Sequence, residues 1–212
     1  MKWNNGFIIG DGKTDATGKI DRVGDNIERF IGGSDYGGAI YLENLTLPDE
    51  IIDECIEFVM TRHPRLFVGA SENLSEVGLI EARFHLSPVM LLHKLGLLDE
   101  NCTVVGANFL DNDDISLIKQ CGARVTLCPT YACGMGFGFP NVRPMLGKIE
   151  VGLGTMDNSF NKSGSVVDEA RLLLLGTNCS MRSAEALSIT EIGEIIGFTG
   201  SEMELGNLLN LK

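Results

Sequence analysis

The chain has 212 residues, 44% of them hydrophobic and 22% charged, so it is long enough to bury a core without disulfides. Its net charge of −12 argues against a phosphate-neutralising surface, and we expect no nucleic-acid or membrane partner. The six cysteines are scattered, and the start of the chain has no apolar run as long as a signal peptide. These features predict a cytoplasmic globular protein with free thiols.

Short apolar runs closed by glycines predict strands at residues 6–10, 18–24 and 38–43. A helix is expected over 47–63, where acids follow Pro48 and apolar residues recur at helical spacing. Strands and helices then alternate. The expected strands are 65–70, 103–110, 124–129 and 148–154, and the expected helices are 88–98, 111–122, 140–147, 165–176 and 183–197. The last segment, 203–211, is expected to be extended.

The strands after residue 38 are nearly continuous apolar runs, which indicates a parallel sheet buried on both faces. Strand and helix alternate about five times up to residue 176, as in α/β proteins. Two architectures fit this alternation, a doubly wound open sheet and part of a (β/α)8 barrel. In both architectures, functional side chains are expected at the carboxyl ends of the strands.

Two glycine-rich stretches lack the spacing of nucleotide-binding loops. Residues 8–14, IIGDGKT, have Phe7 where a phosphate loop needs its first glycine, and no helix is predicted to follow. Residues 133–140, CGMGFGFP, are expected to form a loop whose Phe137 and Phe139 either cover a ligand or fill a core. Neither stretch predicts a cofactor, and none is expected.

The metal-binding residue types are also poorly spaced for a metal site. Cys128 and Cys133 have no second pair of cysteines, which a zinc ribbon requires. The histidines, His63, His85 and His93, are expected on or beside helices rather than at strand ends.

Two carboxylates follow predicted strand ends. Glu72 comes just after the strand at 65–70, and Asp157 just after the strand at 148–154. A pair of acids at one rim can perform general acid–base work. Either acid could instead cap the helix that follows it.

The order of several segments resembles the second half of the metal-dependent amidohydrolases, in the branch of cytosine deaminase, S-adenosylhomocysteine deaminase and the triazine hydrolases. The similar segments include VGASENLSEV, GLLDENCTVVGANFLDNDDI and SAEALSITEIGEIIGF, and the resemblance covers residues 38–197. It implies a partial TIM-type (β/α) barrel over 38–197. Residues 1–37 would be the strands of a remnant β-sandwich, and 198–212 a strand returning to it.

The resemblance also assigns positions for metal ligands, and this chain departs from the family there. The family's two strand-end histidines correspond to Gly69 and Gly106, and its aspartate after Gly-Thr corresponds to Met156. The family's His-x-His pair is absent from the sequence. Since glycine offers no donor, a metal ion is not expected.

Three functions are compatible with these residues. The first is a non-catalytic or regulatory subunit, whose open barrel edges are covered by a second copy or a partner subunit. The second is a metal-independent enzyme acting on a small heterocyclic compound, with Glu72 as acid or base, Asp157 as a second catalytic carboxylate, and Asn108 and Met156 contacting the substrate. The third is a metal site completed by histidines from a partner.

Overall fold

The structure, a computed structural model, describes residues 19–23, 27–31, 39–156 and 159–211. The strand expected at 6–10 and the side chain of Asp157 lie outside the described residues. In the described part of the chain, no helix is both long and apolar enough to cross a bilayer. All six cysteines are free thiols, as expected from their scatter along the sequence.

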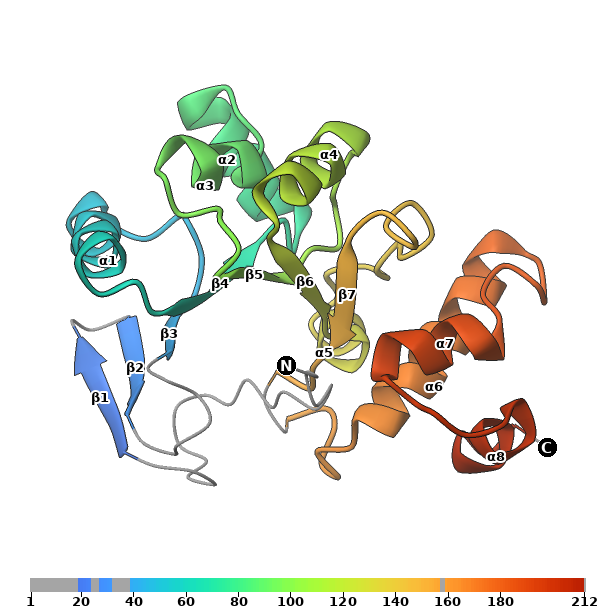
Figure 1. Cartoon of the computed structure of the whole chain (residues 1–212). Coiled ribbons are helices and arrows are strands. Elements are labelled where there is room, and N and C mark those ends of the chain that lie inside the picture. Colours follow the sequence, from blue (N-terminus) through green and yellow to red (C-terminus); the bar gives the residue numbers. More distant parts are fainter. Residues whose placement is uncertain (1–18, 24–26, 32–38, 157–158, 212) are drawn as a thin grey trace.

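One sheet of seven strands organises the described residues, and the strands lie side by side in chain order (Figure 1). They are β1 Lys19–Val23, β2 Ile27–Ile31, β3 Ala39–Leu42, β4 Arg65–Ala70, β5 Cys102–Gly106, β6 Arg124–Leu127 and β7 Glu150–Leu153. Strands β3 to β7 are parallel, and β1 and β2 extend the sheet beside β3 as an antiparallel pair. A parallel order without reversal is that of a (β/α) barrel, whereas a doubly wound sheet reverses its order at a switch point.

Helices α1 to α4 lie along one face of the sheet, and α6 to α8 gather beyond β7 (Figure 1). The helices are α1 Asp49–Arg62, α2 Leu74–Phe84, α3 Pro88–Lys94, α4 Asn112–Cys121, α5 Pro129–Gly134, α6 Val166–Met181, α7 Ile189–Ile196 and α8 Glu202–Leu208. Both α6 and α7 contact β7. The described part of the chain is therefore an α/β unit with five parallel strands, as predicted.

The two faces of the sheet bury different residues because side chains alternate along a strand. Val68, Val104 and Val125 point into the main core, which the helices cover. Phe67 and Val105, one position away, belong to a smaller cluster on the opposite face. That second face corresponds to the interior of a closed barrel, and it leads to the carboxyl ends of the strands.

Side-chain caps determine where the helices begin. The carboxylate of Asp111 accepts the backbone N–H of Asp114 at 2.8 Å at the start of α4, and Gly122 ends this helix in the left-handed conformation. These boundaries confirm the helix predicted over 111–122. Helix α2 is not among the predicted helices, although Asn73 caps it by accepting the N–H of Glu76 at 2.9 Å.

The prediction of an extended segment over 203–211 is wrong because helix α8 forms there. This segment is part of the return strand expected over 198–212. Ser201 and Glu204 form a capping box that starts the helix. Leu205 and Leu209, four residues apart, are both buried, as on one face of a helix. The amphipathic spacing outweighs the apolar character that suggested a strand.

Two other boundaries differ from the prediction. Residues 143–148 form turns in place of the helix expected over 140–147, because Pro144 removes a backbone donor. Strand β5 ends at Gly106, before the expected end at 110, because Gly106 and Ala107 both have positive φ. The chain therefore turns sharply at the rim of the sheet.

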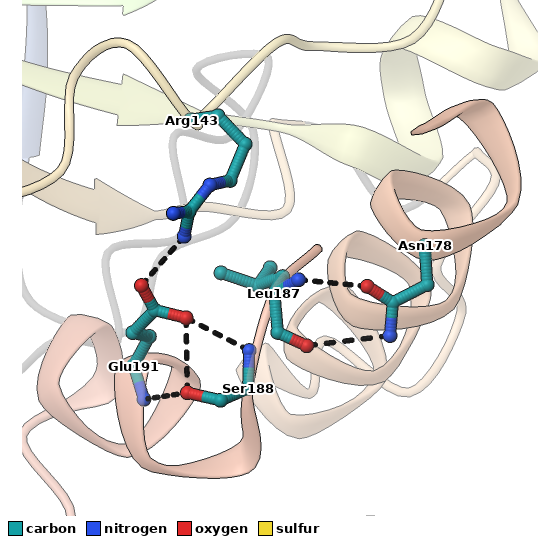
Figure 2. A network of polar contacts seen from close by, with 5 residues as sticks. All are labelled: Arg143, Asn178, Leu187, Ser188 and Glu191. Carbon is teal, nitrogen blue, oxygen red and sulfur yellow. Dashed lines mark hydrogen bonds and ion pairs between the residues drawn. The ribbon is translucent and has the colours of Figure 1, made fainter. Parts of the chain in front are cut away.

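A polar network fixes α7 against α6 and the turn that contains Arg143 (Figure 2). The Asn178 side chain accepts the N–H of Leu187 at 2.7 Å and donates to the carbonyl of Leu187 at 3.3 Å. Ser188 and Glu191 form the capping box of α7, and the other Glu191 oxygen accepts Arg143 Nη1 at 2.5 Å. Leu187 is 1% exposed, so its backbone groups depend on Asn178 as their partner.

We therefore expect Asn178→Ala to lower the free energy of unfolding by about 1–3 kcal/mol, because it leaves buried backbone groups unpaired. Arg143→Met is the matched control, since it breaks an ion pair whose side chains are 36% and 31% exposed. Its cost should stay below about 1 kcal/mol. Urea unfolding measures both values, and equal losses for the two variants would contradict this account of Asn178.

Candidate functional site

Three residues at the carboxyl ends of parallel strands have left-handed backbone conformations. Ser71 follows β4, Ala107 follows β5 and Met156 follows β7, with φ values of 55°, 50° and 59°. Such conformations cost roughly 1–2 kcal/mol each in residues other than glycine and persist where neighbouring contacts impose them. They mark one rim of the sheet, the rim at which α/β proteins place functional groups.

Glu72 lies at this rim, on a loop whose backbone is held from two sides. The carboxylate of Glu76 accepts the N–H of Ser71 at 3.1 Å and the N–H of Glu72 at 2.8 Å. Asn108 Nδ2 donates to the carbonyl oxygen of Glu72 at 2.8 Å. The structure thus brings Glu72 and Asn108 together, as one site requires, but through the backbone of Glu72 rather than its carboxyl group.

The glycines at the expected ligand positions have their side-chain space taken by neighbours. A Cβ on Gly106 would lie 2.3 Å from Cγ and 2.8 Å from Oε1 of Glu72. A Cβ on Gly69 would lie 2.0 Å from the carbonyl oxygen of Glu43 and 3.4 Å from Cδ of Glu72. Any larger side chain at these positions must therefore displace Glu72 or the backbone at Glu43.

Burial, first of all, and the negative charges of Glu76 and Glu43 together raise the pKa of the Glu72 carboxyl to about 8. The carboxyl is therefore mostly protonated at neutral pH. Burial likewise raises the pKa of Glu76, but its bonds from the backbone N–H groups of Glu72, Ser71 and Asn73 oppose that shift. The two acids differ because only Glu76 is supplied with donors.

Met156 packs into a buried cluster on the inner face of the sheet. The cluster contains Phe67, Val105 and Cys128, with Tyr41 and Tyr131 against it. The Tyr41 hydroxyl donates to the Met156 sulfur at 3.9 Å, and Met156 is 7% exposed. Burial raises the pKa of Tyr41 well above its usual value, and the nearby Glu72 charge adds to the effect. The residue expected to contact a substrate is therefore mainly a packing residue.

The residues at this rim do not fit the metal ion that the resemblance implies. Gly69 and Gly106 have no side-chain donor, and the thioether of Met156 is a weak, soft ligand that already accepts from Tyr41. Across the described ranges, no group of three or more His, Cys, Asp or Glu side chains could hold a metal. His63, His85 and His93 lie at the end of α1, at the end of α2 and in α3, on or beside helices as expected.

Glu76, Tyr41 and Cys128 shape this site but are not among the residues predicted to form it. Glu76 had a readable signal, because Asn73 precedes it by three residues, as in an N-cap. Tyr41 and Cys128 carry no such signal, since they meet Met156 only after the sheet forms. Phe139, expected in a loop over a ligand or in a core, packs against the main core and over Gly176.

The raised pKa of Glu72 predicts how stability depends on pH. The folded pKa of about 8 lies above the ordinary value of 4.5, so the folded state holds a proton that the unfolded state releases between these values. The stabilisation is complete below about pH 4.5 and is lost as the pH rises through about 8. Glu72→Gln should flatten this decline, so the variant melts above the wild type at pH 9. Thermal melts from pH 6 to 9 test this, and parallel curves for the two proteins would refute it.

Comparison with known proteins supports the resemblance read from the sequence. The chain is 30% identical over 109 residues to a 5-methylthioadenosine/S-adenosylhomocysteine deaminase of Pyrococcus abyssi, covering 51% of this chain and 26% of the relative. It is 24% identical over 202 residues to the deaminase of the same name from Bacillus cereus (strain ATCC 14579), covering 89% of this chain and 46% of the relative. The chain thus spans less than half the length of these relatives. No family model matches it.

The fold is shared with solved structures of the same group. An adenosine deaminase from Xanthomonas campestris with bound zinc superimposes with a TM-score of 0.64 at 18% identity, covering 74% of this chain and 38% of that protein. The matched region is part of a TIM-type barrel, so the five parallel strands described here are a partial barrel. The chain is thus similar in sequence to curated deaminases and similar in fold to a solved adenosine deaminase.

Proposed function

We propose that this chain is an amidohydrolase-like, deaminase-branch protein that has lost the metal centre and serves as a non-catalytic or regulatory subunit. One observation carries the proposal. The spaces in front of Gly69 and Gly106, where the resemblance expects histidines, are taken by the Glu43 carbonyl and the Glu72 side chain. These atoms therefore fill the space at the rim that the metal-binding side chains would need.

The chemical consequence follows from the role of the metal in hydrolysis. A bound metal lowers the pKa of water from about 15.7 to about 7 and so supplies hydroxide at neutral pH. A neutral Glu72 carboxyl cannot replace this effect, because it carries no positive charge and is itself mostly protonated. The same packing argues against a metal site completed by a partner's histidines, since those side chains would need the same space.

The sheet edges bear on the proposed assembly. Of the two barrel edges expected to be open, the one at β3 is paired with β2, so the described sheet ends at β1 and β7. Helices α6 and α7 contact β7, but no described strand pairs with its outer side. An unpaired edge favours association, and we propose a homodimer or a partner subunit at β7.

A second candidate is a metal-independent enzyme that uses Glu72 as acid or base on a small heterocyclic compound. The observation that favours it is the pKa of about 8, close to the pH at which such a group exchanges protons efficiently. Ser71 and Ala107 also have strained, left-handed backbone conformations, and conformations of this kind are common at active sites.

The metal proposal predicts that the purified protein, incubated with Zn²⁺ and dialysed, retains far less than one equivalent by elemental analysis. It should release no ammonia from 5′-methylthioadenosine or S-adenosylhomocysteine, the compounds named for its relatives. The double variant Gly69→His/Gly106→His should not gain zinc, because Glu72 and the Glu43 backbone occupy the space. Stoichiometric zinc in the wild type would overturn the proposal. Turnover abolished by Glu72→Gln without zinc would favour the second candidate.

The assembly proposal predicts a mass above that of one chain by light scattering. Gly152→Lys on β7, where an added Cβ meets nothing closer than 3.9 Å, should shift the distribution toward the monomer, because charged residues discourage pairing at a sheet edge. Glu50→Lys on the exposed start of α1 is the control and should leave the mass unchanged. A wild-type protein that stays monomeric at high concentration would contradict the assembly proposal alone.

A further inference from the structure

Helix α2 buries one side and leaves the opposite side exposed and uncharged. Glu76 and Ile80 lie on its buried side. Because a helix turns about 100° per residue, the opposite side carries five exposed residues without charge, which we call the α2 face: Leu74, Ser75, Gly78, Leu79 and Ala82. Leu74 is 68% and Leu79 61% exposed, and among the large apolar side chains of the described residues only Met203 exceeds them. Contiguous exposed apolar residues of this kind mark interaction surfaces.

The centre of the α2 face has room for a close neighbour. A Cβ added to Gly78 would meet nothing within 4 Å. Packing within the chain therefore does not require a glycine here, although glycine lowers helix stability relative to alanine. With Ser75 and Ala82 next to Gly78, a second helix can approach closely, and the leucines at the two edges of the face can pack against it.

The two edges of the α2 face carry opposite charges. Glu81 lies on the same edge as Leu74, and Arg83 lies on the same edge as Leu79. Both side chains are exposed. Nη2 of Arg83 donates to the two carboxylate oxygens of Asp49 at 2.8 and 2.7 Å, and a guanidinium group has further donors to offer. An acid and a base thus flank one apolar surface.

A second copy of the chain fits this arrangement of charges. When two α2 helices lie side by side and parallel about a two-fold axis, the Glu81 edge of each faces the Arg83 edge of the other. The net charge of −12 opposes contact between copies over most of the surface, whereas an uncharged face with complementary edges avoids that repulsion. A strongly basic partner is less suited to this face, because its acid and base are balanced.

We propose that the α2 face binds a second copy of this chain through parallel α2 helices related by a two-fold axis, with Glu81 of each copy against Arg83 of the other. This contact is separate from the one proposed at β7. Helix α2 follows β4 in the middle of the sheet, whereas β7 is the last strand of the sheet (Figure 1).

The test uses sedimentation equilibrium of the full chain carrying Gly152→Lys, so that the β7 contact does not contribute. This reference protein should form a reversible dimer at low ionic strength. Adding Glu81→Arg or Arg83→Glu should raise the dissociation constant at least about tenfold, because two contacts between opposite charges become contacts between like charges. An equimolar mixture of these two variants should associate again as the reference does, since each supplies the charge that the other lacks.

Two further variants separate this contact from unspecific effects. Gly78→Gln should also weaken the dimer, and since the new side chain favours a helix and meets no neighbour in the chain, the loss reflects a blocked approach rather than unfolding. Glu194→Arg on α7 makes the same change of charge as Glu81→Arg at another exposed position and should leave the dissociation constant unchanged. Circular dichroism of each variant confirms that its fold is retained.

A reference protein that stays monomeric, an unchanged dissociation constant in Gly78→Gln, or no recovery in the mixture would each overturn this inference. The β7 contact is tested separately, by the fall in mass from the wild type to Gly152→Lys. Zinc content and ammonia release test the metal-free role, whatever the outcome at α2.

Discussion

The Glu76 carboxylate, which accepts two backbone N–H groups in the loop after β4, is the contact on which the rest of the rim depends. It holds Ser71 in a left-handed conformation and thereby directs Glu72 toward Gly106. Asn108 then joins the loop after β5 to the same segment. Burial and the negative charges of Glu76 and Glu43 raise the pKa of the neighbouring Glu72 carboxyl, and the backbone donors that could oppose this rise are bonded to Glu76 instead.

The fold that this chain shares with solved deaminases and the metal chemistry expected from the resemblance depend on different residues. The parallel sheet requires apolar strands such as Val68 and Val104 packed under helices, and those contacts are intact. Metal chemistry requires donors at a few rim positions, which here are occupied by glycines and a buried methionine. The similarity to solved structures therefore supports the architecture of the chain, whereas its function must be argued from the rim itself.

The sequence predicted the parallel strands well because each is a short, nearly continuous apolar run, and α4 well because Asp111 and Gly122 are strong boundary signals. Helix α8 was predicted as a strand, since its few apolar residues fit either spacing over so short a segment. At the rim, Glu72 could be picked out from its place after a predicted strand, whereas Asn108 lay inside the strand expected over 103–110 and was picked out through the resemblance. The sequence alone could not show that the space in front of Gly69 and Gly106 is filled. That contact depends on how Glu43 and Glu72, 29 positions apart in the sequence, meet across neighbouring strands.

The close approach of the Glu43 carbonyl to Gly69 has a consequence for mutational history. A histidine introduced at Gly69 alone meets backbone atoms, which cannot rotate away, and one introduced at Gly106 alone meets the Glu72 side chain at a residue with φ of +85°. Each single substitution is thus destabilising before any metal ligand set is complete. A series of single substitutions toward a metal-binding rim at these two positions therefore has to pass through less stable proteins.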